Sequence, residues 1–239
     1  MFKLVRRLCL GFAVAGMFSP QLLAATPSYQ PLVDKLSRVA PGINQQALKH
    51  AIAAMQCAVN NGAEPAQRLA VIDYSQPSSA RRLWMFDLQR NRLLLRDFVA
   101  HGRMSGENFA TRFSNTVGSY QSSLGLFRTE ETYLGKHGYS LRMDGLERGV
   151  NDRARERAIV IHAADYVNPY WISKQGRIGR SLGCPAVRPE VARMVIDNLK
   201  GGQFMFSWYP DQRWLQRADY LNCKSQRVAS VLRSGKNRG

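Results

Sequence analysis

Residues 68–100, RLAVIDYSQPSSARRLWMFDLQRNRLLLRDFVA, decide the fold. Three short apolar runs, RLAVIDY, RLWMFDL and RLLLRDFVA, are separated there by turn residues. Short apolar runs bounded by turn residues are typical of strands that follow one another in a sheet. The stretch therefore predicts three successive strands.

The same pattern continues toward the C-terminus in SSLGLFRT, YSLRM, AIVIHA and QFMFSWY. Strands at this density, with few helical patterns between them, favour a mainly β sandwich or barrel. One helix interrupts them in RPEVARMVIDNLKGG. Pro189 suits its first turn, Glu190 suits its positive end, and Gly201 ends it.

The segment before Gly62 is predicted to be helical. Its apolar residues recur at helical spacing, Asn44 is placed to cap the helix, and a shorter helix is expected over residues 32–39; the apolar positions are Leu48, Ile52, Met55 and Val59. We expect this segment to serve structural packing.

The first 25 residues have the layout of a secretory signal peptide. Basic residues at positions 3, 6 and 7 precede an apolar run from about Leu8 to Phe18, and small residues end at Ala25. We expect export to the periplasm or cell envelope, with cleavage near Ala25 and no integral membrane contact afterwards. An uncleaved membrane anchor is the alternative.

The chain is strongly basic, with 34 Lys and Arg against 17 Asp and Glu and a net charge of +17. Such a charge attracts polyanions without naming one. An exported protein rarely meets nucleic acid, so we expect no nucleic-acid partner and consider instead the carboxylates of cell-wall peptides and lipid headgroups. Because the basic residues are scattered along the sequence, most are expected to form a solvated surface.

The cysteines point to one free thiol. Of the four, Cys9 leaves with the signal peptide, and three remain, which is an odd number for an oxidising compartment. Cys57 and Cys223 could pair and leave Cys184 free, but the sequence leaves that pairing open.

Cys184 lies in the loop GRIGRSLGCPAVRPE, residues 176–190, which enters the helix at Pro189. A reactive cysteine needs its thiolate stabilised, and the helix start is one source of positive potential. Flanking basic residues are a second source: Arg177, Arg180 and Arg188. The backbone N–H groups of Leu182, Gly183 and Cys184 could converge as an oxyanion hole. We prefer this interpretation to a buried structural cysteine.

Four histidines are available as a base: His50, His101, His137 and His162. His162 ends the strand AIVIHA at the rim of the sheet and is the leading candidate. His101 and His137 each precede a glycine and could bind substrate, act as a second catalytic group or simply form turns. His50 is expected on a helix surface. The chain has no HExxH, CxxC or clustered carboxylates, so no metal or other cofactor is expected.

His162 followed by GRSLGCP resembles the signature of the YkuD-type L,D-transpeptidases of bacterial cell walls. The segments FVAHGRMSG, ATRFSNTVGSYQSSLGLFRTEETYLGKHGYSLRM, NDRARERAIVIHAADYV and GRIGRSLGCPAV extend the resemblance to the murein L,D-transpeptidase catalytic domain family, over roughly residues 70–208. It implies a YkuD-like β-sandwich that carries out acyl transfer on peptidoglycan stem peptides without a cofactor.

The resemblance also implies roles for individual residues. Cys184 takes the position of the nucleophile and His162 that of the general base. The carbonyl of Ala163 would hold the imidazole tautomer. Gly183 and Cys184 would supply oxyanion N–H groups, and Ser181 would shape the loop.

The sequence departs from the family pattern at two positions. Leu182 stands where many members have a second histidine, whose duty would fall to His101 or His137 or be absent. Ala186 stands where many have an arginine, for which Arg188 is a weak substitute in substrate binding.

The expected organisation is a signal peptide (1–25), a helical segment (26–62), an L,D-transpeptidase-like catalytic domain (63–212) and a basic C-terminal tail (213–239). The expected activity is L,D-transpeptidation through a cysteine thioester. An L,D-carboxypeptidase using the same Cys/His pair and a non-catalytic wall-binding protein are the alternatives.

Overall fold

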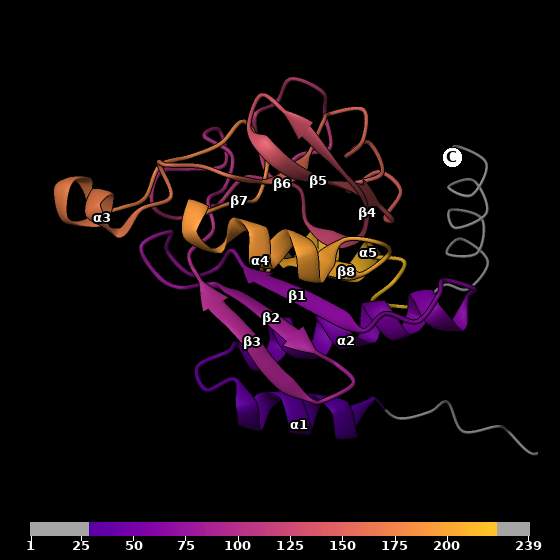
Figure 1. Cartoon of the computed structure of the whole chain (residues 1–239). Helices are drawn as coiled ribbons and strands as arrows, with labels where there is room; N and C mark the ends of the chain where they lie inside the picture. The colour runs from indigo at the N-terminus through magenta and orange to yellow at the C-terminus, as the bar shows by residue number, and fades with distance from the viewer. Residues whose placement is uncertain (1–28, 224–239) are drawn as a thin grey trace, which may run out of the picture.

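The structure is a computed structural model that describes residues 29–223 (Figure 1). The expected signal peptide and the last part of the basic tail lie outside the described residues. Two helices come first, α1 (Gln30–Val39) and α2 (Gln45–Asn60). Asn44 caps α2, because its side-chain oxygen accepts hydrogen bonds from the backbone N–H groups of Gln46 (2.9 Å) and Ala47 (3.2 Å). The expected helix and its cap are confirmed.

Within residues 29–223, eight strands form one hydrogen-bonded sheet in the order β3–β2–β1–β8–β4–β5–β6–β7. Seven strands coincide with the runs expected from sequence, so the mainly β class is confirmed, whereas the two-residue β7 has no apolar run to reveal it. The strands are β1 (Arg68–Asp73), β2 (Leu83–Asp87), β3 (Arg92–Asp97), β4 (Gly125–Gly135), β5 (Gly138–Gly145), β6 (Val160–Ala163), β7 (Ala186–Val187) and β8 (Phe204–Trp208).

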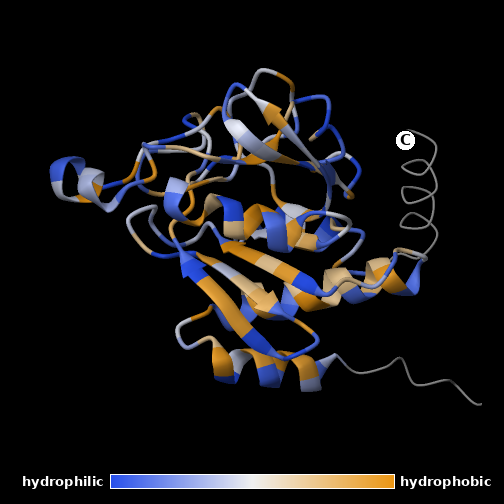
Figure 2. Cartoon of the chain, viewed as in Figure 1, coloured by the Kyte–Doolittle hydropathy of each residue, from blue (hydrophilic) through white to orange (hydrophobic). Residues whose placement is uncertain are grey.

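The two halves of the sheet lie on opposite sides of the expected helix, α4 (Pro189–Leu199). In Figure 1, β1 to β3 lie below α4 and β4 to β6 above it, and α4 contacts β1, β5 and β6. Helix α2 also contacts β1. Five of the six residues of β1 are buried, and the strand is largely hydrophobic in Figure 2, while α1 is striped along its length. The core therefore continues from the N-terminal helices into the sheet.

Two short helices were not predicted from the sequence, α3 (Pro169–Gln175) and α5 (Gln212–Arg217). Helix α3 projects from the body of the molecule (Figure 1) and buries none of its residues. The Asn168 side chain caps it, and Gly176 ends it in the left-handed conformation with φ of 75°. Its seven residues are too few to show a helical period in the sequence.

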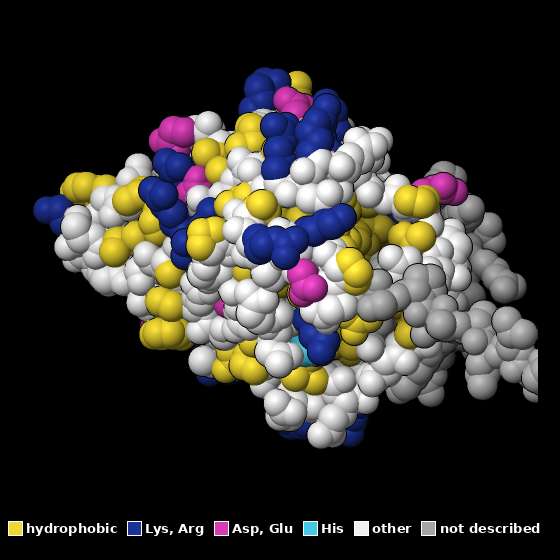
Figure 3. All heavy atoms as spheres, turned by 90° about the horizontal axis from the view of Figure 1, so that it is seen from below, with side chains coloured by type: hydrophobic (Ala, Val, Ile, Leu, Met, Phe, Trp, Pro, Cys, Tyr) yellow, Lys and Arg dark blue, Asp and Glu magenta, His cyan; other side chains and the backbone are white. Residues whose placement is uncertain are grey.

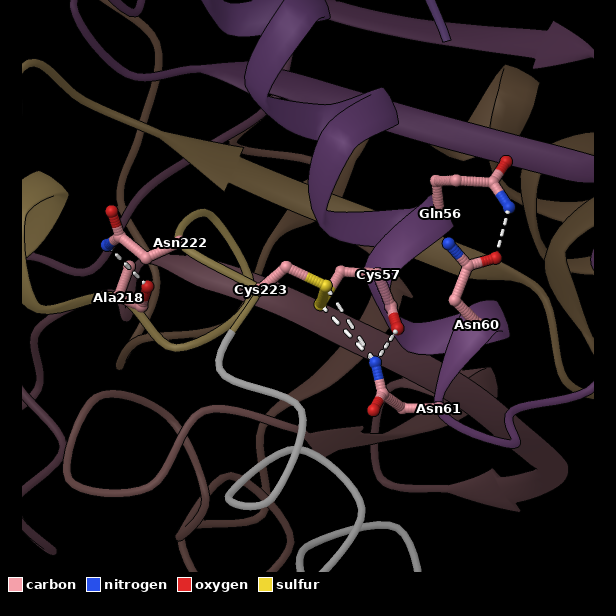
Figure 4. The surroundings of a disulfide bond; sticks show 7 residues. All are labelled: Gln56, Cys57, Asn60, Asn61, Ala218, Asn222 and Cys223. Carbon is pink, nitrogen blue, oxygen red and sulfur yellow. Dashed lines mark hydrogen bonds between the residues drawn. A yellow bond between two sulfur atoms is a disulfide. The ribbon is translucent and has the colours of Figure 1, made fainter. Parts of the chain in front are cut away.

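A disulfide ties the end of α2 to the segment that follows α5. Cys57 is bonded to Cys223 across 166 positions of the sequence, with the two Cα atoms 5.4 Å apart (Figure 4). The Asn61 side-chain amide donates to the Cys57 carbonyl oxygen at 2.8 Å beside this bond. Cys184 is the free cysteine of the described residues. The structure thus settles the pairing that the sequence left open.

The surface carries its excess positive charge in several separate groups. Figure 3 shows these groups of Lys and Arg side chains on the face seen from below, with fewer Asp and Glu among them. In the part of the chain that the structure describes, no helix combines the length and the apolar character that crossing a membrane requires.

Candidate active site

His162 lies in β6, the strand between β5 and β7. It is paired in register with Ser140 of β5 and with Ala186 of β7. Its Nδ1 lies 2.7 Å from the carbonyl oxygen of Ala163. Because a carbonyl can only accept, Nδ1 carries the proton in the neutral ring, and Nε2 keeps a free lone pair. His162 is only 2 % exposed. This burial lowers the pKa of its imidazole, so the ring is neutral at pH 7.

The loop that carries Cys184 is closed by the hydroxyl of Ser181. Ser181 Oγ donates to the Cys184 carbonyl oxygen at 2.6 Å and accepts from the Gly183 N–H at 3.0 Å. Gly183 has φ of 125°, and a Cβ at this position would lie 2.9 Å from the Gln121 carbonyl oxygen. Only glycine fits this close, left-handed turn. The expectation that Gly183 donates its N–H to an oxyanion is wrong for this geometry, because Ser181 already accepts that N–H.

The sulfur of Cys184 lies beside the start of β6. The parallel register that pairs His162 with Ala186 places Cys184 next to Val160. Burial raises the pKa of the partly buried Cys184 thiol, and the N–H groups of Val160 and of Cys184 itself offset part of that rise. The Ala158 carbonyl oxygen lies 3.6 Å from Sγ, where the thiol can donate to it. At rest the thiol is protonated, so it needs a base to react.

The arginines expected to activate Cys184 are paired elsewhere. Arg180 and Arg177 bind the carboxylate of Glu107 at 2.6 and 3.0 Å. Arg188 makes a two-pronged ion pair with Asp97, at 3.0 and 2.7 Å. The flanking-charge expectation is therefore wrong. The cations that lower the pKa of the Cys184 thiol are instead Arg157 and Lys136.

Lys136 and His137 lie in the turn between β4 and β5. The His137 ring stacks on the His162 ring with centroids 4.3 Å apart and planes 22° apart. Beyond the larger effect of burial, both turn residues lower the pKa of His162, and Lys136 also lowers that of Cys184. One turn thus faces both reactive groups. Of the two histidines left open by the sequence, His137 is the one brought to His162.

His101 is not available to a substrate. It is fully buried, Arg82 Nη2 donates to its Nδ1 at 2.7 Å, and its Nε2 lies 3.3 Å from the Gly106 carbonyl oxygen. Burial, with Arg82 beside it, lowers the pKa of His101 to about 3. The substrate-binding expectation for His101 is corrected to a structural position, because both ring nitrogens are used inside the protein.

The two departures from the family pattern have different surroundings. Leu182 is 52 % exposed at the surface of the loop. Ala186 is fully buried in β7, among Phe98, Ala100 and Ile178. An arginine at position 186 would bury an unpaired charge in this apolar cluster, which explains why the position is small here. Arg188 is held by Asp97 through two hydrogen bonds, and its role in substrate binding stays a prediction.

Sequence reasoning missed three neighbours of Cys184: Arg157, Ala158 and Val160. Arg157 belongs to the charged run NDRARER, which gives no signal to separate it from Arg153 or Arg155. Between residues 29 and 223, no group of three or more His, Cys, Asp or Glu side chains is placed to hold a metal ion. The site offers acyl-transfer chemistry built from a thiol, an imidazole and backbone amides.

Comparison with known proteins assigns residues 39–208 to a family model described as the L,D-transpeptidase catalytic domain. Thirteen chains among the solved structures are similar, including the following two. An L,D-transpeptidase from Mycobacterium smegmatis is 15 % identical, with 60 % of this chain and 59 % of that chain covered and a TM-score of 0.38. An L,D-transpeptidase from Stackebrandtia nassauensis is 14 % identical, with 77 % and 92 % covered and a TM-score of 0.36. This chain thus spans 59 % of the mycobacterial chain. No curated protein sequence matches it.

Proposed function

The chain belongs to the L,D-transpeptidase catalytic domain family, and we propose that it is an exported cysteine acyltransferase that acts on peptidoglycan stem peptides. The observation that carries this proposal is the pairing of a free thiol with a base of fixed tautomer: Cys184 lies two positions before the ladder partner of His162, whose Nδ1 is held by Ala163 at 2.7 Å. This arrangement supports a role in nucleophilic catalysis, in which a third group orients the base.

In the first half of the reaction, His162 Nε2 takes the proton of the Cys184 thiol. The thiolate then attacks the carbonyl carbon between the L-configured centre of the diamino acid and the terminal D-alanine of a tetrapeptide stem. Burial raises the pKa of the thiol, so this transfer coincides with attack. His162 gives its proton to the leaving amine, D-alanine departs, and a thioester remains on Cys184.

In the second half, an amine of a neighbouring stem attacks the thioester carbonyl and gives up a proton to His162. The new amide is a 3-3 cross-link, and the proton returns to the Cys184 thiolate. If water attacks instead, the product is a shortened stem, and the same residues act as an L,D-carboxypeptidase. The Cys184 N–H is proposed as the oxyanion donor of the loop, since the Gly183 N–H donates to Ser181.

His137 and Lys136 are proposed to contact the substrate. Both are exposed on the turn that faces His162. A stem peptide carries free carboxylates, and a cationic lysine beside the reactive groups favours their approach. His137 is thereby proposed to take over the role of the second histidine that many family members have at the position of Leu182.

The Cys57–Cys223 disulfide supports export, because structural disulfides persist mainly in oxidising compartments. A signal peptide over residues 1–25 is proposed to direct this export. N-terminal sequencing of the protein recovered from the cell envelope is expected to show a start near Thr26. Recovery of the intact N-terminus would favour an uncleaved anchor.

The activity is tested by incubating the mature protein with disaccharide-tetrapeptide muropeptides and separating the products. The proposal expects released D-alanine together with 3-3 linked dimers, both absent with Cys184→Ala. Release of D-alanine without dimers would identify a carboxypeptidase. Binding of muropeptides with no released D-alanine would contradict catalysis and favour a wall-binding protein.

A further inference from the structure

Arg157 is a half-buried arginine whose two terminal guanidinium nitrogens hold one segment. Nη1 donates to the Ser114 carbonyl oxygen at 2.6 Å and to the hydroxyl of Ser123. Nη2 donates to the Gln121 carbonyl oxygen at 2.6 Å and contacts the hydroxyl of Ser119 at 3.3 Å. Four partners from residues 114–123 thus converge on one side chain. Such a planar fork fixes geometry in a way that a lysine cannot.

The segment that Arg157 holds lies directly against the loop of Cys184. A Cβ added at Gly183 would be 2.9 Å from the Gln121 carbonyl oxygen and 3.5 Å from Arg157 Nη2. Ser122, in the same segment, donates its hydroxyl to the Gly183 carbonyl oxygen at 3.3 Å. The guanidinium is therefore next to Gly183, the residue before Cys184. It also holds in place the segment against which Gly183 packs.

The backbone after Arg157 is also aimed at the sulfur. Ala158 has a left-handed φ of 51°, unusual for a residue with a side chain, and its carbonyl oxygen lies 3.6 Å from Cys184 Sγ. Backbone held in a sparsely populated conformation is strained, and such residues cluster at functional sites. Strand β6, with His162, begins at Val160. Arg157 thus lies between the loop that carries Cys184 and the strand that carries His162.

The other polar groups around Cys184 and its proposed base differ from Arg157 in charge or in exposure. Lys136 of the β4–β5 turn is cationic and exposed, so solvent and salt screen it. Tyr74, after β1, and Tyr166, after β6, are neutral phenols whose pKa burial raises. His162 is kept neutral by burial. Among the described groups, Arg157 is therefore the half-buried fixed cation at the site.

We propose that Arg157 is a positioning residue for Cys184: its guanidinium locks residues 114–123 against the loop of the thiol and places a fixed positive charge beside the sulfur. The inference rests on the proposed role of Cys184 as the nucleophile. Arg157 was not a candidate site residue from the sequence, because nothing in the charged run NDRARER distinguishes it from Arg153 or Arg155. Its charge favours the thiolate, and its hydrogen bonds keep the sulfur in line with the base.

The test measures the rate of Cys184 alkylation by iodoacetamide as a function of pH, with intact mass confirming a single modified site. No turnover is needed, so a protein that alkylates normally but forms no product would count against the proposed function and not against Arg157. Arg157→Met is expected to move the midpoint of the alkylation profile to higher pH by about one unit, the lower end of the effect of a close opposite charge. Below the midpoint its alkylation is expected to be about tenfold slower.

Two variants complete the design. Arg153→Met removes an arginine of the same run that pairs with exposed Glu156 at 2.8 Å, and it is expected to keep the native midpoint. Arg157→Lys retains the charge without the fork, so its midpoint is expected to stay near the native one while muropeptide turnover falls at least tenfold, and it serves if the methionine variant does not fold. A native midpoint in folded Arg157→Met, or native turnover in Arg157→Lys, would overturn the proposal.

Discussion

Ser181 shows how a single hydroxyl shapes a reactive loop. It is buried, and its one oxygen accepts from Gly183 and donates to the Cys184 carbonyl. The two hydrogen bonds therefore fix the width of the turn. The serine expected from the sequence to brace the loop does make the contacts that bracing requires.

Ser181→Ala is predicted to slow acylation of Cys184 and to destabilise the fold. The change leaves a buried N–H and a loop carbonyl without their partner, at a cost of about 1–3 kcal/mol. A small displacement of the sulfur is expected to lower the acylation rate by about tenfold or more. Urea unfolding measures the loss of stability, and the rate at which a carbapenem acylates Cys184 measures the kinetic effect.

Ser173→Ala is the matched control, because the hydroxyl of Ser173 donates to the Tyr170 carbonyl oxygen on exposed α3 at 2.8 Å. It is expected to leave both quantities unchanged. A native acylation rate in Ser181→Ala would show that the loop does not depend on this hydroxyl.

At the scale of elements, the β4–β5 turn covers His162 and lowers the pKa of its imidazole. The His137 ring covers the His162 ring, and Lys136 lies near both His162 and Cys184. The turn keeps the pKa of His162 below its ordinary value of 6.5, mainly through burial and secondarily through like charges. The base is then fully available at pH 7 and is lost only in more acidic solution.

The acylation rate is accordingly predicted to fall on the acid side of pH 6.5, as His162 takes up a proton. His137→Ala removes the ring that covers His162 and a positive charge beside it. The pKa of His162 is therefore expected to rise, and the acid limb of the acylation profile is expected to move to higher pH by about half a unit. Acylation profiles and NMR titration of His162 measure the shift. Leu134→Ala, a residue 84 % exposed in the same hairpin, is the control and should leave the limb in place. An unmoved limb in His137→Ala would contradict the role assigned to the turn.

Elements with a period were predictable, and contacts between distant segments were not. The strand runs and Asn44 carry local signals that the structure follows. Strand β7 has only two residues and forms because Ala186 pairs with His162. The approach of Arg157 and Lys136 to Cys184 likewise depends on how the sheet folds around α4, which no local pattern states. The sequence therefore marked Cys184 and His162 as candidates, while the charged groups around them could not be predicted from it.

At the scale of the whole molecule, the N-terminal helices and the C-terminal segment enclose the sheet. Trp214 of α5 is buried and donates to the Glu147 carboxylate at 3.0 Å, and Tyr220 is 1 % exposed. Burial raises the pKa of Glu147 to about 7. The disulfide joins this segment to α2. The described part of the expected basic tail is thus docked on the core.

Replacing Cys57 and Cys223 together by alanine is predicted to lower the free energy of unfolding by about 2–5 kcal/mol, since the bridge closes a very long loop of the unfolded chain. Urea unfolding without reductant measures the loss. Cys184→Ala, which removes the unbridged cysteine, is the control and should lose much less. Equal free energies of unfolding for the proteins with and without the disulfide would contradict its stabilising role.

The central claim is that the Cys184 sulfur, deprotonated by His162, forms an acyl-enzyme. Intact-mass spectrometry of the mature protein with a carbapenem, whose strained lactam carbonyl acylates nucleophilic thiols, measures this step directly. The account predicts a single adduct located on Cys184, none with Cys184→Ala, and much slower formation with His162→Ala. An unmodified native protein, or an adduct that persists in Cys184→Ala, would contradict it.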